Sequence, residues 1–114
     1  MSKKTTNLTS LNPETRLVLA GREFAEHGIV NPAVYHASTI TFPTVKALHE
    51  RDQPYTYGRK GTPTSRAVET AIAALEGGHD CKISSSGLAA VTTTLLAFLK
   101  TGEHVLIPDT VYYP

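Results

Sequence analysis

The sequence has only one cysteine, Cys81, among its 114 residues, so no disulfide can form within the chain. Sparse use of cysteine is typical of proteins in a reducing compartment, and we expect a cytoplasmic protein. Long apolar runs are missing as well: residues 95–99 form one of the longest, and they are far too few to cross a bilayer. No apolar run follows the first ten residues, which are polar and expected to be flexible, so the sequence predicts no secretory signal.

An excess of charge of one sign is also absent. The chain carries 11 Lys and Arg against 10 Asp and Glu, which gives a net charge of +1. This balance argues against nucleic acid or an anionic membrane as the main partner. Because 40% of the residues are hydrophobic, the composition does not predict intrinsic disorder. The length sets the expectation of one domain at most.

Metal-binding motifs are lacking too. The five histidines are scattered without the spacing of metal ligands. His49 and Glu50 begin an H-E-x-x-H pattern, but Gln53 replaces the second histidine, so we expect no metal site. Cys81 lies in an apolar stretch and is expected in a core. Residues 84–86 lack the G-x-S-x-G context of a nucleophilic serine.

The first half of the chain does contain helix signals. Asn12 and Pro13 predict a helix start, and Gly21 marks the end of that helix. Residues 28–43 hold Gly, Pro and β-forming residues without a sustained period, which predicts an extended arm. Residues 44–51 predict a short helix.

In the second half, helices are predicted to alternate with strands. One helix begins at residues 62–63, with threonine as N-cap and proline at the first position, and ends at the glycines of residues 77–78. Residues 80–84 and 104–107 are strand candidates, and residues 87–100 between them repeat Leu and Val at helical spacing. Such a unit has parallel strands joined by a right-handed crossover, and it predicts an α/β fold.

This α/β prediction leaves the sheet incomplete. Two short parallel strands are not a stable sheet by themselves, and parallel sheets are normally covered on both faces. The sequence ends soon after the second strand, and the arm of residues 28–43 has no expected surface to lie on. We therefore expect either the front part of a longer α/β protein or a chain that needs a partner.

Residues 84–87, three serines and a glycine, form a small-residue turn between the first strand and the following helix. Free backbone N–H groups and the positive end of the helix dipole meet at such a turn, so the expected guest is a phosphate or another oxyanion. Gly87 lets the guest approach the backbone. The alternative is an ordinary turn capped by serine, since the motif is neither a Walker A loop nor G-x-G-x-x-G.

Further candidate residues lie on loops. Ligands of doubly wound folds bind beyond the carboxyl ends of the strands, which predicts that residues 108–114 share an edge with the turn. Tyr112 or Tyr113 could then stack on a planar ligand, with packing under a loop as the alternative. Arg59, two residues after Tyr57, is suited to bind an oxyanion through two parallel hydrogen bonds. A solvated loop cation is the alternative for Arg59.

Five motifs follow one another along the chain. They are V-N-P-A-V-Y-H-A-S-T-I-T-F at residues 30–42, Y-G-R at 57–59, L-E-G-G at 75–78, S-S-G-L-A-A at 85–90 and D-T-V-Y at 109–112. In this order and spacing, the sequence resembles the cysteine/methionine-metabolism family of pyridoxal-phosphate enzymes. The resemblance covers nearly the whole chain from about residue 12 onward.

The resemblance implies an aspartate-aminotransferase-like fold (PLP fold-type I) and a homotetramer built from two dimers. Residues 1–61 would form the N-terminal arm and interface segment. Residues 62–114 would be the start of the α/β domain that binds pyridoxal 5'-phosphate. The partners implied are an amino-acid substrate and further copies of the chain, with no nucleic acid and no membrane.

The resemblance also implies roles for individual residues. Tyr57 and Arg59 would cross the dimer interface and bind the cofactor phosphate of the neighbouring subunit. Backbone N–H groups at Gly87 and Leu88 would bind the phosphate, and the family usually has Met in place of Leu88. Tyr112 would stack on the pyridine ring and transfer protons. The implied cofactor-binding residues are Tyr57, Arg59, Ser86, Gly87, Leu88 and Tyr112, and the implied catalytic residues are Tyr57 and Tyr112.

Within the family, the Y-G-R-K-G-T segment is similar to the β-lyase branch. The γ-synthases and γ-lyases usually have Asn where this sequence has Thr62, and they are the alternative. The β-lyase branch implies cleavage of L-cystathionine to homocysteine, pyruvate and ammonia.

The resemblance implies that essential groups lie beyond residue 114. These are the Schiff-base lysine, the Asp that pairs with the pyridine nitrogen and the Arg that binds the substrate carboxylate. The lysines at positions 3, 4, 46, 60, 82 and 100 are not in the family's cofactor-lysine motif. We therefore expect the 114-residue chain alone to be inactive. Two alternatives remain: a phosphate-binding or partner-binding module without catalysis, and a structural remnant.

Overall fold

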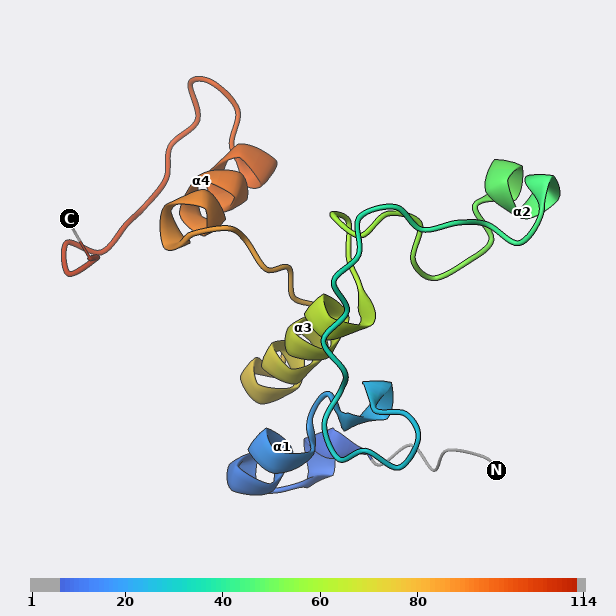
Figure 1. Cartoon of the computed structure of the whole chain (residues 1–114). Helices are drawn as coiled ribbons and strands as arrows, with labels where there is room; N and C mark the ends of the chain where they lie inside the picture. Colours follow the sequence, from blue (N-terminus) through green and yellow to red (C-terminus); the bar gives the residue numbers. More distant parts are fainter. Residues whose placement is uncertain (1–6, 113–114) are drawn as a thin grey trace. The chain divides into compact units, whose positions relative to one another are not determined.

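The computed structural model describes residues 7–112 and divides into two compact units, Met1–Lys82 and Ile83–Pro114 (Figure 1). Within the described residues, regular secondary structure consists of helices and one isolated β-bridge. The functional division at residues 61 and 62, between an interface segment and a cofactor domain, stays a prediction.

The first unit holds most of the helices. Their bounds are Leu8–Ser10 for the 3-10 helix η1, Pro13–Leu19 for α1, Arg22–Phe24 for the 3-10 helix η2, Val45–Glu50 for α2 and Pro63–Glu76 for α3. Helices α1 and α2 confirm the two helices predicted in this half of the chain. Within the start that is expected to be flexible, residues 8–10 form η1, and Ser10 Oγ donates to the Asn7 carbonyl at 3.0 Å; the flexibility itself stays a prediction. Residues 1–6 lie outside the described part.

Helix α3 has the start and the end that the sequence predicts. Thr62 Oγ1 accepts a hydrogen bond from the Ser65 N–H at 3.4 Å, and Ser65 Oγ accepts one from the Thr62 N–H at 2.9 Å. This reciprocal capping box satisfies two N–H groups at the helix start. Pro63 occupies the first turn, and Gly77 ends the helix with a left-handed φ of 67°.

Within the first unit, α1 and η2 pack on α3. Gly21, between α1 and η2, lies against α3: a Cβ on Gly21 would be 3.0 Å from the Ala67 carbonyl oxygen. Arg16 Nη1 donates to the Ala74 carbonyl at 3.5 Å. Figure 1 shows α1 beside α3. Buried residues are few in the described part of the chain, and Ala67, which is 7% exposed, is the hydrophobic side chain among them.

The predicted arm of residues 28–43 is confirmed as an irregular, extended segment. Its one regular contact is an antiparallel bridge between Thr39 and Tyr57. Beside the bridge, the Gly58 N–H donates to the Ser38 carbonyl at 2.7 Å. The arm therefore lies along the loop that carries the Y-G-R motif.

In the described part of the second unit, residues 83–112, the regular structure is helix α4 at Gly87–Phe98, in agreement with the prediction. The two strands predicted at residues 80–84 and 104–107 are wrong for the described chain, since neither stretch pairs with another backbone segment. A strand is stabilised by its neighbour, and two short segments do not provide a sheet. The predicted strand–helix–strand unit therefore appears as a helix between two irregular segments.

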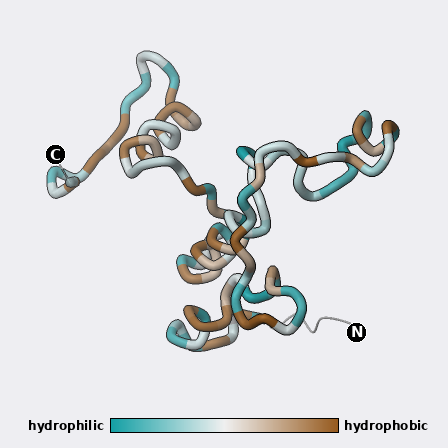
Figure 2. The backbone as a smooth tube through the Cα atoms, viewed as in Figure 1, coloured by the Kyte–Doolittle hydropathy of each residue, from teal (hydrophilic) through white to brown (hydrophobic). Residues whose placement is uncertain are grey.

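Large apolar side chains of the second unit are exposed. Leu88 and Phe98 of α4 are 78% and 81% exposed, and Leu106 is 99% exposed. Figure 2 shows hydrophobic positions along α4 and in the segment that follows it. Within the described residues, this unit has no buried apolar side chain of its own.

Candidate functional site

Arg59 lies at the corner of a tight turn. The Lys60 N–H donates to the Tyr57 carbonyl at 2.9 Å and closes the turn over Gly58 and Arg59. The Arg59 side chain is exposed, and its guanidinium makes no hydrogen bond or ion pair with the residues between 7 and 112. Tyr57 is 39% exposed. The turn thus presents a phenol and a free guanidinium, the pair that the sequence predicts for phosphate.

Gly58 allows the arm to approach this turn closely. A Cβ on Gly58 would overlap the carbonyl group of Ala37 in the arm. Only a residue without a side chain permits this approach of two backbones. The glycine of the Y-G-R motif therefore has a packing role in addition to linking the two predicted ligands.

A second contact, made by the Thr64 hydroxyl and called here the Thr64 clip, joins the arm to the start of α3. Thr64 Oγ1 donates to the Ala33 carbonyl at 2.9 Å and accepts from the Tyr35 N–H at 2.8 Å. One hydroxyl therefore uses its donor and an acceptor position on the same stretch of arm backbone. Tyr35 also donates its phenol to Glu26 Oε2 at 3.5 Å.

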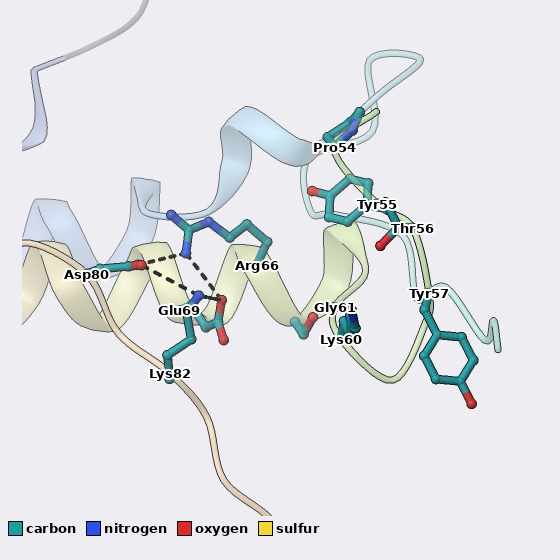
Figure 3. Close-up of a pocket in the computed structure, with 11 residues that line it drawn as sticks. Pro54, Tyr55, Thr56, Tyr57, Lys60, Gly61, Arg66, Glu69, Asp80 and Lys82 are labelled. Atoms are coloured by element: carbon teal, nitrogen blue, oxygen red, sulfur yellow. Dashed lines mark hydrogen bonds and ion pairs between the residues drawn. The ribbon is translucent and has the colours of Figure 1, made fainter. Parts of the chain in front are cut away.

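Between the loop of residues 54–61 and α3 lies a hollow of about 330 Å³ (Figure 3). Its walls are the loop before α3, the first turns of α3 and the segment after α3. The ring of Tyr57 points away from the charged residues of the hollow, whereas Tyr55 lies nearer to Arg66 (Figure 3). The lining residues are Pro54, Tyr55, Thr56, Tyr57, Lys60, Gly61, Ser65, Arg66, Glu69, Asp80 and Lys82.

One side of the hollow is a charged cluster of four residues, which we call the α3 charge cluster: Arg66, Glu69, Asp80 and Lys82. Arg66 Nη1 lies 2.7 Å from Asp80 Oδ1 and 3.3 Å from Glu69 Oε2. Lys82 Nζ lies 3.1 Å from Glu69 Oε2 and 3.5 Å from Asp80 Oδ2. Glu69 is 9% exposed, so its charge is buried between two cations.

Sequence reasoning missed the α3 charge cluster. A partial signal was present, since Arg66 and Glu69 are three residues apart and share a helix face. Asp80 and Lys82 join them only because the chain turns back at Gly77, and that contact follows from the tertiary structure.

The cluster changes the acidity of its members. The hydrogen bond from Arg66, followed by the one from the Cys81 N–H, lowers the pKa of Asp80 from 3.8 to about 2. The hydrogen bond to Asp80 raises the pKa of Arg66, and the hydrogen bond to Glu69 raises the pKa of Lys82. Burial raises the pKa of Tyr55, against the opposing effect of Arg66. Tyr55 is therefore a neutral phenol at the wall of the hollow.

The start of α4 is the predicted anion site. Ser86 Oγ accepts from the Ala89 N–H at 3.1 Å, and the Ser86 carbonyl accepts from the Ala90 N–H at 3.0 Å. The N–H groups of Gly87 and Leu88 precede the first intrahelical bond and remain available. A Cβ on Gly87 would meet no atom within 4 Å. The residues present fit the phosphate end of pyridoxal phosphate, because donors and space coincide.

Tyr112 is 86% exposed and follows a turn in which the Val111 N–H donates to the Pro108 carbonyl at 3.2 Å. Within the described part of the second unit, no hydrogen bond joins Tyr112 to the start of α4. Tyr113, the other candidate for stacking, lies outside the described residues.

The structure thus places Tyr57 and Arg59 on one loop, and Ser86, Gly87 and Leu88 at one helix start. The two groups belong to different units, and the roles of all these residues stay predictions. Across residues 7–112, no three His, Cys, Asp or Glu side chains are arranged to hold a metal ion. In the same range, no helix combines the length and apolar character needed to cross a membrane.

Comparison with known proteins gives a consistent result. The model of the family described as Cys/Met metabolism PLP-dependent enzyme matches residues 14–114. A putative cystathionine beta-lyase of Rhizobium johnstonii is 46% identical over 115 residues, which covers 100% of this chain and 29% of the relative. An L-alanine/L-glutamate racemase of Wolbachia pipientis is 41% identical over 120 residues, which covers 90% of this chain and 29% of that protein.

A solved structure extends the comparison to the fold. The crystal structure of metB from Corynebacterium glutamicum superposes with a TM-score of 0.76 at 31% identity, covering 87% of this chain and 25% of that one. The described chain, whose regular secondary structure is mostly helical, therefore follows the backbone of part of a larger protein. It spans 29% of the length of the curated relatives named above.

Proposed function

Because the chain belongs to the family of Cys/Met-metabolism PLP-dependent enzymes, we propose that it forms part of a carbon–sulfur β-lyase that cleaves L-cystathionine to homocysteine, pyruvate and ammonia. The observation that carries this proposal is the 46% identity, over the whole chain, to a putative cystathionine beta-lyase. The Y-G-R-K-G-T segment supports the same branch of the family.

In this proposal the chain holds the phosphate of pyridoxal phosphate. The N–H groups of Gly87 and Leu88, at the positive end of the α4 dipole, bind phosphate oxygens, and Ser86 lies beside them. Arg59 binds a phosphate through two N–H groups of its fork. The bound cofactor supplies an electron sink for a carbanion at Cα of the amino acid. The lysines of this sequence do not lie in the family's motif for covalent attachment of the cofactor.

Tyr57 and Tyr112 would act near the reacting atoms. Both phenols are accessible, and each can donate its O–H to a phosphate or exchange a proton at its oxygen. The flat face of Tyr112 is suited to cover a pyridine ring. We assign Tyr112 the proton transfer because Tyr57 shares its turn with the phosphate ligand Arg59.

We propose that the phosphate bound by Tyr57 and Arg59 belongs to a second copy of the chain. The exposed guanidinium of Arg59 has no partner among the described residues, and a phosphate of a neighbouring subunit would provide one. Two such exchanged contacts make a symmetric dimer, and a pair of dimers makes the expected tetramer.

A second reaction is favoured by one specific observation, the 41% identity to an L-alanine/L-glutamate racemase. Both reactions begin with loss of the Cα proton, so the same first residues serve either one. The γ-synthase and γ-lyase types are further alternatives within the family, although they usually have Asn where this sequence has Thr62.

The products distinguish these reactions. The protein expressed from its complete reading frame is supplied with pyridoxal phosphate and then with L-cystathionine, L-alanine or L-glutamate. Release of pyruvate and homocysteine supports the β-lyase, release of cysteine supports γ-cleavage, and loss of optical rotation supports the racemase. Absence of pyruvate from saturating cystathionine overturns the β-lyase proposal. We expect no turnover from the 114-residue chain alone.

A further inference from the structure

The loop that carries Tyr57 and Arg59 is held by backbone contacts with the arm. The Gly58 N–H donates to the Ser38 carbonyl at 2.7 Å, next to the bridge of Tyr57 with Thr39. No side-chain bond of Arg59 to the described residues fixes its position. The direction of Arg59 therefore depends on where the arm lies.

Thr64 fixes the other end of the same stretch of arm. Its hydroxyl donates to the Ala33 carbonyl at 2.9 Å and accepts from the Tyr35 N–H at 2.8 Å. The arm and the segment from Tyr57 to Thr64 run in opposite directions, since the earlier arm residues meet Thr64 and the later ones meet Tyr57. The arm of residues 33–39 is thus clipped at both ends to one short segment.

Thr64 is not needed to cap its own helix. The reciprocal bonds of Thr62 and Ser65 already satisfy the start of α3. Both hydrogen-bonding functions of the Thr64 hydroxyl are directed to the arm instead. A role confined to helix stability does not explain this geometry.

Gly58 makes the clip sensitive to small displacements. A Cβ at Gly58 would overlap the Ala37 carbonyl, so the two backbones touch directly beside the bridge of Tyr57 with Thr39. If the arm moves away, the turn of Tyr57 and Arg59 loses the surface against which it is packed.

We propose that Thr64 is a positioning residue: by clipping the arm at Ala33 and Tyr35, it holds the Tyr57–Arg59 turn in the orientation that binds a phosphate. The inference rests on the proposed function for the identity of the phosphate. The contact between Thr64 and the arm does not involve the cofactor, so it is tested independently of cofactor binding.

The first test measures hydrogen exchange of the Gly58 amide in the protein from the complete reading frame. Thr64→Val removes the hydroxyl at nearly constant volume, and we expect about tenfold faster exchange at Gly58, because two hydrogen bonds to the arm are lost. Thr64→Ser keeps the hydroxyl and should restore protection. Thr70→Val, on the same helix, is the matched control. Unchanged exchange in Thr64→Val overturns the clip.

The second test is a double-mutant cycle on the dissociation constant of pyridoxal phosphate. Thr64→Val alone should weaken binding about 3- to 10-fold, and in the Arg59→Ala background it should have no further effect. Equal weakening in both backgrounds overturns the positioning role, because Thr64 would then act independently of Arg59. If the wild-type protein binds no pyridoxal phosphate, the proposed function fails, while the exchange test still decides whether the clip exists.

Discussion

Arg66 Nη1 lies 2.7 Å from Asp80 Oδ1 and joins the first turn of α3 to the segment that follows the helix. This ion pair makes stability depend on pH. The pKa of Asp80 falls from 3.8 to about 2 in the folded chain, so the folded state favours the carboxylate. The stabilisation is fully present well above pH 3.8 and is lost as the pH falls through about 2.

Asp80→Asn tests this dependence. We expect the variant to unfold at a lower temperature than wild type near neutral pH, with the difference disappearing as the pH approaches 2, measured by thermal unfolding across an acid series. Asp52→Asn removes an exposed carboxylate without an ion pair among the described residues and serves as control. A difference that stays constant down to pH 2 would contradict the assignment.

Glu69→Gln should destabilise the first unit by about 1–2 kcal/mol, because Arg66 and Lys82 lose the buried charge that they share. The value lies below that of a fully buried pair, since Lys82 is largely exposed and screened by solvent. Urea unfolding measures the change. Glu76→Gln, exposed at the end of the same helix, should have no effect. An equal loss of unfolding free energy in both variants would show that the ion pairs of the α3 charge cluster add nothing to stability.

Arg59→Ala should weaken retention of pyridoxal phosphate by about 1.5–3 kcal/mol, the range for a charge-assisted hydrogen bond. Dialysis followed by titration with the cofactor measures the dissociation constant in the protein from the complete reading frame. Lys46→Ala removes an exposed cation whose ion pair with Glu50 lies in α2, and it controls for net charge. Retention equal to that of wild type would refute the phosphate assignment.

Two substitutions at Ser86 separate capping from phosphate binding. Ser86→Ala removes the acceptor for the Ala89 N–H and should destabilise α4 by about 0.5–2 kcal/mol. Ser86→Asp keeps an N-cap acceptor, so helix stability should be retained, but the added charge should repel a phosphate. Circular dichroism and cofactor titration give the two readouts. If Ser86→Asp bound the cofactor as tightly as wild type, the phosphate would not lie at this helix start.

Gly21→Ala and Gly77→Ala compare two positions with positive φ. In each variant, alanine must adopt a left-handed backbone conformation, which lowers the free energy of unfolding by about 1 kcal/mol. Gly21→Ala should lose more, because its Cβ would lie 3.0 Å from the Ala67 carbonyl, whereas nothing lies within 4 Å of a Cβ on Gly77. The free energy of unfolding in urea measures the difference. Equal losses would show that α1 can move away from α3.

The helices could be predicted because their signals are local. Thr62, Pro63 and Gly77 define the bounds of α3 without reference to the rest of the chain. Ser86 and Gly87 do the same for the start of α4. Family motifs then named Tyr57, Arg59 and Tyr112 as site residues, and their roles stay predictions.

The strands and the charged contacts could not be predicted in the same way. Val105 and Ile107 have the residue types of a strand, but a strand depends on a partner segment. Arg66 and Asp80 meet through a chain reversal, and the sequence gives no distance between them. The contact of the Thr64 hydroxyl with the arm could not be predicted either, because a threonine early in a helix most often hydrogen-bonds to the backbone of its own helix.

The self-contained ends of α3 have a consequence for the order of folding. A helix whose capping box and terminal glycine are within its own residues can form before any distant segment arrives. The arm, α1 and Asp80 each attach to α3 by closing a loop, and loop closure delays their docking. Substitutions inside α3 should therefore slow refolding, whereas substitutions in the attached segments should mainly accelerate unfolding.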